Sequence, residues 1–282
     1  MSLGNVEARL PAMEISKIFV VYDPTRAEQP ALVRAAGIAA EIGCKVHVFA
    51  AIYADIGKGD SRPAEIKHLI ACQKTVLEGA VAPLLERGIA VTTEVEWEKD
   101  WYTAVVRASI RNDADVVLKS SYRHSTRERI LNRTSDWTLI RECLCPVLLV
   151  KEGKARDLRR VLAAIDIRSG RESYEKLNEH IINLSKRILD TEKAEVHFIN
   201  AFKDFHTVPD RNTLIRNCGV SSDRIHIQMG EPDDVIVRGA RDLDASLVVI
   251  GNSARSGLSA VINGNTVERV LDRLDCDVLS MP

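Results

Sequence analysis

The 282-residue sequence lacks the features that would place it in a membrane or on nucleic acid. No apolar run approaches the roughly 20 residues that a helix needs to span a bilayer. Residues 1–9 have neither the basic region nor the apolar core of a secretory signal. Because the formal net charge is only −1, no broad basic surface is available for nucleic acid. We therefore expect a cytoplasmic protein that binds neither membranes nor nucleic acid.

Motifs of catalysis and of metal binding are also missing. The six cysteines are scattered without Cys-x-x-Cys spacing, which is typical of small core residues in a reducing compartment. The seven histidines show no zinc-binding spacing. There is no Gly-x-Ser-x-Gly, no P-loop and no Gly-x-Gly-x-x-Gly. Since no set of nucleophile, base and orienting acid can be assembled, we expect no enzymatic activity and no metal site.

Short β-branched runs alternate with segments of helical periodicity in the first half of the sequence. Strands are predicted at 17–22, 45–52, 91–97, 115–118 and 146–150. Helices are predicted at 31–42, 64–87, 101–111 and about 137–142. Strands separated by helices favour parallel βαβ units. With 45% apolar and 28% charged residues, the composition is that of a packed globular protein.

The same order of elements starts again after a polar segment at 152–157. Residues 161–166 repeat the first strand and end in an aspartate, and 195–202 resemble 45–52 even in the position of a histidine. Arg238 and Cys276 follow Arg107 and Cys145 at one common offset. Like residues that recur in the same order indicate a duplicated domain. The equivalent histidines, His47 and His197, are expected to be packed and hydrogen-bonded inside the sheet.

The repeat predicts an α/β fold of two tandem Rossmann-like domains at residues 15–152 and 157–282, each with a five-stranded, parallel, doubly wound sheet. Each half ends in an apolar strand, at 146–150 and 278–281. A lone domain would leave such a strand as an unpaired edge. We therefore expect the halves to pack together as an internal pseudo-dimer.

A glycine-containing loop in the second half is the strongest candidate for a binding site. The buried strand at 247–250 is followed by the small-residue segment 251–257, and residues 264–266 open a helix at 267–271. Glycines let a backbone approach a phosphate, and a helix start offers free N–H groups. The alternative is a strand-to-helix connection that needs glycine only for its turns.

The spacing of Gly251 and Gly264-Asn265 resembles that of the universal stress proteins. Their ATP-binding members carry Gly-x-x-Gly, nine residues, then Gly-Ser/Thr after the fourth strand. With two such domains in one chain, the sequence looks most like the tandem E-type members of that family. It departs from the pattern at Ala254, where the second glycine is expected, and at Asn265, where Ser or Thr is usual.

This resemblance implies that Asp166 faces the adenine or ribose of a nucleotide. It also implies that the phosphates lie among Gly251, Ser253, Ala254, Gly264, Asn265 and Thr266. An aspartate after a strand can instead cap the next turn with its side chain. The methyl group of Ala254 can block a close backbone approach, whereas Asn265 tolerates unusual backbone angles and can donate to a phosphate. We therefore expect at most weak binding of ATP or AMP, in the second domain.

The first half has no glycine between residue 119 and its last strand, so no nucleotide is expected there. This segment carries the cations Lys119, Arg123, His124, Arg127, Arg129 and Arg133. They either meet an anion or a partner or simply form a solvated helix face.

The preferred hypothesis for function is a non-enzymatic stress protein that binds a small molecule or a protein partner. The alternative is a switch that binds ATP and hydrolyses it slowly, although the loop 251–266 holds no acidic residue to place a metal ion. An apolar ligand in the same crevice is a third hypothesis. A further homodimer of the tandem chain is left open.

Overall fold

The computed structural model describes residues 15–122, 138–153, 159–167, 172–190, 194–252, 266–271 and 273–282. In the first half the elements are β1 (Lys17–Val21), α1 (Pro30–Ile42), β2 (Lys45–Ile52), α2 (Arg62–Glu86), β3 (Val91–Trp97), α3 (Trp101–Arg111), β4 (Val116–Ser121) and β5 (Val147–Lys151). A short helical segment, 138–142, precedes β5.

The second half repeats this order of strands and helices, with helices of different lengths. Its elements are β6 (Arg160–Ala164), α5 (Glu172–Asp190), β7 (Glu195–Phe202), η1 (Phe205–Thr207), α6 (Arg211–Cys218), η2 (Ser222–Arg224), β8 (Ile225–Met229), α7 (Pro232–Asp242), β9 (Leu247–Gly251), α9 (Thr266–Leu271) and β10 (Asp277–Met281). The largest difference lies between the second and third strands, where α2 has 25 residues and α6 has 8.

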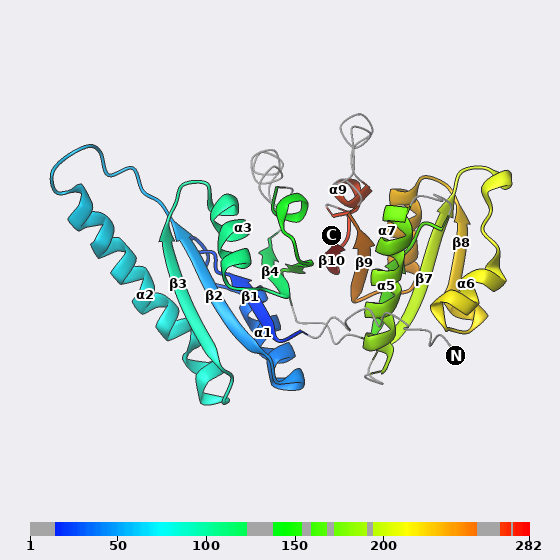
Figure 1. Cartoon of the computed structure of the whole chain (residues 1–282), viewed down its shortest axis with the longest axis horizontal. Helices are drawn as coiled ribbons and strands as arrows, with labels where there is room; N and C mark the ends of the chain where they lie inside the picture. The colour runs from blue at the N-terminus through cyan, green and yellow to red at the C-terminus, as the bar shows by residue number, and fades with distance from the viewer. Residues whose placement is uncertain are drawn as a thin grey trace, which may run out of the picture.

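One ten-stranded sheet runs through both halves in the order β3-β2-β1-β4-β5-β10-β9-β6-β7-β8 (Figure 1). All neighbouring strands are parallel except β5 and β10, which pair antiparallel through Val147↔Ser280, Leu148↔Leu279 and Leu149↔Val278. The final strands of the two halves therefore satisfy each other's edges. The predicted fold class and the internal pseudo-dimer are confirmed, and the exact domain boundaries stay a prediction.

Alternation along the strands divides the apolar residues between two cores. On β1, Ile18 and Val20 face one core, and Phe19 and Val21 face the other, because successive side chains point to opposite faces of a sheet. Helices α1, α2, α5 and α6 cover the first core, and α3, α7, α9 and 138–142 cover the second. Helices on both faces make the sheet doubly wound. None of the helices in the described ranges has the length and hydropathy of a membrane span.

Candidate functional site

The ends of β6 and β9 border a cavity of about 150 Å³ in the second half. These two strands are neighbours, yet the chain leaves them in opposite directions across the sheet, towards β7 and β10. Such a reversal of strand order is where parallel α/β sheets usually bind ligands. Asp166, Gly251 and Thr266 all line this cavity. The structure thus brings these three sequence-predicted residues together, whereas Ser253, Ala254, Gly264 and Asn265 lie outside the described residues.

Asn178 holds the backbone at Asp166 in place. Its Oδ1 accepts from the Asp166 N–H at 3.1 Å, and its Nδ2 donates to the Asp166 carbonyl at 2.7 Å. One amide side chain therefore pairs with both main-chain groups just beyond the end of β6, as a neighbouring strand would. Asn200 of β7 donates from Nδ2 to the carbonyl of Ile165 at 3.0 Å. We call the contact of an amide side chain with both backbone groups of a strand-end aspartate the amide clamp.

Close packing of α5 explains the glycine at position 251. A Cβ atom at this position would lie 2.5 Å from Cδ2 and 2.7 Å from Cγ of Leu177, well inside van der Waals contact. It would also lie 3.2 Å from Cδ1 of Ile181. The packing of the helix therefore requires glycine here, whether or not a ligand does. This observation favours the structural interpretation of the first glycine of the loop.

The described wall of the cavity combines aliphatic and polar groups. Its apolar side chains include Ile165, Ile181, Ile199, Ile236 and Ile250. Polar atoms come from Asp166, Tyr174, Asn178 and Thr266. Sequence analysis missed Tyr174, Leu177 and Asn178, although their spacing with Ile181 marks one face of a helix. The cavity is smaller than the roughly 300 Å³ at the lower end of common ligand pockets.

At the corresponding place in the first half, the loop after β1 crosses the strand ends and is held there by hydrogen bonds. Gln29 forms the same amide clamp on Asp23, accepting from its N–H at 3.1 Å and donating to its carbonyl at 2.7 Å. The Asp23 carboxylate accepts from the backbone and hydroxyl of Thr25 at 2.9 and 2.6 Å, so this aspartate caps a turn. Tyr122 donates to the carbonyl of Glu28 at 2.7 Å and closes the loop over the strand ends. The cations predicted after Lys119 lie outside the described residues.

Polar contacts also join the two halves. Arg34 of α1 pairs with Asp277 of β10 at 2.8 Å, with both side chains largely buried. Asp277 also accepts from the Lys151 N–H at 2.9 Å, and the Lys151 ammonium donates to the Leu271 carbonyl at 2.8 Å. A second cavity, of about 730 Å³, lies beside these residues. This junction could not be read from residue spacing.

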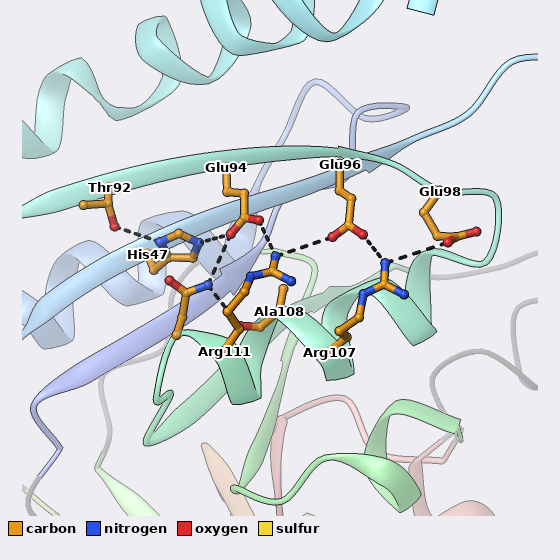
Figure 2. Close-up of polar contacts among 9 residues, drawn as sticks. His47, Thr92, Glu94, Glu96, Glu98, Arg107, Ala108 and Arg111 are labelled. Carbon is orange, nitrogen blue, oxygen red and sulfur yellow. Dashed lines mark hydrogen bonds and ion pairs between the residues drawn. The ribbon is translucent and has the colours of Figure 1, made fainter.

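A ladder of ion pairs packs α3 onto β3 on the outer side of the first half (Figure 2). Its members are Glu94 and Glu96 of β3, Glu98 just after that strand, and Arg107 and Arg111 of α3. Because both arginines are 47% exposed, this ladder contributes little to stability. Within the ranges described above, no group of three or more His, Cys, Asp or Glu side chains is arranged to hold a metal ion.

The fold and the cavity together define a tandem, doubly wound α/β protein with its candidate site at a strand crossover. A model of the universal stress protein family matches residues 14–151 and 213–282, and the chain belongs to that family. The predicted resemblance to its tandem E-type members is confirmed. Residues 152–212, which carry Asp166 and Asn178, lie between the two matched regions.

Relatives of the whole chain agree with this assignment. Universal stress protein E of Escherichia coli (strain K12) is 27% identical over 292 residues, covering 93% of this chain and 92% of the relative. A functionally unknown protein from Pseudomonas aeruginosa PAO1 has a similar structure, with 28% identity, a TM-score of 0.75, and coverage of 96% and 93%. A universal stress protein from Archaeoglobus fulgidus DSM 4304 shares the fold at 17% identity, with a TM-score of 0.71 and coverage of 95% and 97%.

Proposed function

We propose that this universal stress protein is a cytoplasmic, non-enzymatic receptor for a small molecule that binds at the cavity beside Asp166. The observation that carries the proposal is that Asp166, Gly251 and Thr266, from three separate elements, line one cavity at the crossover of the sheet. Membership of the family supports a role in the stress response. A receptor for a small molecule needs a shaped site but no catalytic groups, which fits a sequence without a catalytic motif.

Adenine nucleotides are expected to bind this site weakly. If the backbone at 254 meets a phosphate, losing one charge-assisted hydrogen bond there costs roughly 1.5–3 kcal/mol. Since 1.4 kcal/mol is about tenfold in affinity, one such loss moves a micromolar site well towards millimolar. The small volume of the cavity, about 150 Å³, supports the same conclusion.

The alternative, a slowly hydrolysing nucleotide switch, has less support. Phosphoryl transfer needs carboxylates that hold a metal ion and a group that positions water. Among the described residues of the cavity wall, Asp166 is the one carboxylate. This one aspartate would therefore have to both hold the metal ion and position the water. Its backbone is also held in place by the amide clamp.

Titration of the full chain with ATP and magnesium tests the nucleotide part of the proposal. We expect at most one weak site, and the double change Ala254→Gly with Asn265→Ser should tighten it by about tenfold or more. A stoichiometry of two, tight binding by the natural chain, or no gain in the double variant would contradict it.

Mass spectrometry of small molecules released from the purified chain tests the receptor itself. Asp166→Ala should lose any molecule that copurifies, because it removes the one carboxylate in the described wall. Asp23→Ala is the matched control in the first half and should retain the molecule. If both variants lose the molecule, or neither does, the molecule does not bind at Asp166 and the proposal is wrong.

A further inference from the structure

Two histidines meet across neighbouring strands at the outer end of the second half. His197 Nδ1 of β7 lies 3.0 Å from His226 Nε2 of β8. Their rings stack with centroids 5.2 Å apart and an interplanar angle of 28°. His197 is buried. A hydrogen bond between two imidazole nitrogens holds one proton, because one nitrogen must donate while the other accepts.

Charged groups border this pair on several sides. Glu195 Oε1 lies 3.4 Å from His197 Nε2 and 3.8 Å from Arg224 Nε. Asp223 of η2 and Arg211 of α6 also act on the pair. On the elements packed against β7, Arg160 of β6 pairs with Asp244 and Arg238 of α7 donates to Gln228. Burial lowers the pKa of both histidines. Glu195 opposes this effect at His197 and Arg224 adds to it, while His197 and Arg211 further lower the pKa of His226. Both rings are therefore neutral at pH 7.

The pair can accept one proton but not two. A first proton fits on His197, because Glu195 faces its Nε2 while its Nδ1–H donates to His226. A second proton, on His226 Nε2, would make both rings cations. Their N–H groups would then point at each other across the 3.0 Å contact. This arrangement offers no acceptor and places like charges in contact, so the two rings must separate.

We propose that His197 and His226 form an acid-sensitive latch that holds β8, with α6, against β7. β8 is the edge strand of the sheet and pairs with β7 from Ile225 to Met229. When both rings are charged, the latch opens and this edge of the second half loosens. Ile199, the register partner of His226, also lines the cavity, so the latch lies next to the candidate ligand site. The latch itself does not depend on the proposed ligand.

The first half has a histidine at the same place but no latch. His47 Nδ1 lies 2.8 Å from the Thr92 hydroxyl, and Nε2 lies 3.3 Å from the Glu94 carboxylate (Figure 2). A hydroxyl can donate or accept, and a carboxylate favours a cation. Burial lowers the pKa of His47, but Glu94 opposes this effect. A protonated His47 therefore keeps both contacts.

The direction of the pH effect follows from the lowered pKa values. A histidine with a lower pKa in the folded state than in the unfolded chain binds more protons when unfolded. The stabilising effect of the latch is therefore complete above the unfolded value of about 6.5 and is lost as the pH falls below it.

Hydrogen–deuterium exchange of the full chain, corrected for the intrinsic effect of pH, tests the latch without any ligand. Between about pH 7.5 and pH 5, exchange of the β8 amides should rise at least about tenfold, since opening takes up at least one proton. Amides of β3, beside His47, should change less: the pKa of His47 is also lowered, but its protonated ring keeps both of its contacts. Equal protection of β8 at both pH values, or an equal rise in β3, would overturn the proposal.

Variants separate the histidine pair from a general acid effect. His226→Gln keeps a hydrogen-bonding partner but removes one titration, and His226→Glu copies the His47–Glu94 arrangement. Both should abolish most of the acid-induced rise in β8 exchange, and His47→Gln is the matched control that should preserve it. If His226→Gln folds and β8 still loosens at low pH, the latch is wrong. NMR titration of the imidazole rings measures the interaction between the two histidines directly. The His197 ring should titrate at higher pH in His226→Gln than in the natural chain.

Discussion

Both halves have an amide clamp just beyond the end of their first strand, but the amide side chain comes from a different part of the chain in each half. Gln29 lies six residues after Asp23, just before α1, and makes the loop fold across the strand ends. Asn178 lies twelve residues after Asp166, inside α5. The loop clamp lies beside the large cavity at the junction of the halves, whereas the helix clamp borders the small cavity at Asp166. The duplicated backbone contact was retained while the space around it diverged.

Position 251 shows the same divergence. Its counterpart in the first half is Ser120, whose hydroxyl accepts from the N–H of Ala31 at 3.0 Å and thereby satisfies the start of α1. Gly251 has no side chain, and Leu177 of α5 occupies the position next to it. One half therefore joins strand to helix by a hydrogen bond, and the other joins them by close apolar packing.

The largest expected effect comes from breaking the junction between the halves. Asp277→Ala should cost about 3–5 kcal/mol of unfolding free energy, because it removes the carboxylate from a buried ion pair with Arg34. Urea denaturation measures this change. Asp244→Asn, in the exposed pair with Arg160, is the control and should cost less than about 1 kcal/mol. Comparable losses in the two variants would show that the junction is not a special contact.

A smaller loss is expected from filling position 251. Gly251→Ala should destabilise the chain by about 1–3 kcal/mol, since its methyl group overlaps Leu177. Adding Leu177→Ala should recover part of this loss, and the double-mutant cycle measures the coupling directly. Ser120→Ala in the first half should cost about 1 kcal/mol with no such coupling. If the losses of unfolding free energy from the two substitutions simply add, Gly251 is needed for the loop rather than for helix packing.

The smallest effect compares the two clamps themselves. Gln29 donates to a second carbonyl, that of Arg26, at 2.8 Å, so it makes one more hydrogen bond than Asn178. Gln29→Ala should therefore destabilise the chain by about 1 kcal/mol more than Asn178→Ala. Thermal unfolding of the two variants under one condition measures the difference. Equal losses would indicate that the extra bond is compensated by water.

The sequence alone determined the order of elements and the duplication. Strands at 45–52, 91–97 and 195–202 and the helix at 101–111 have the predicted bounds, because apolar period and β-branching are local properties. The predicted strand 161–166 was too long: β6 ends at Ala164. Pairing of the two final strands was predicted because each half alone would leave an unpaired strand edge. Asp166 and Gly251 were placed at one crevice because the carboxyl ends of parallel strands share an edge of the sheet.

Only the tertiary structure decided what those residues touch. The clamp of Asn178, the packing of Leu177 on Gly251 and the pairing of His197 with His226 each join side chains from different elements. Arg34 and Asp277 come from opposite ends of the chain. Such contacts depend on helix placement and strand register, and no residue spacing encodes them directly. Residue pattern therefore determines which segments become strands and helices, but close packing in three dimensions determines which side chains become neighbours.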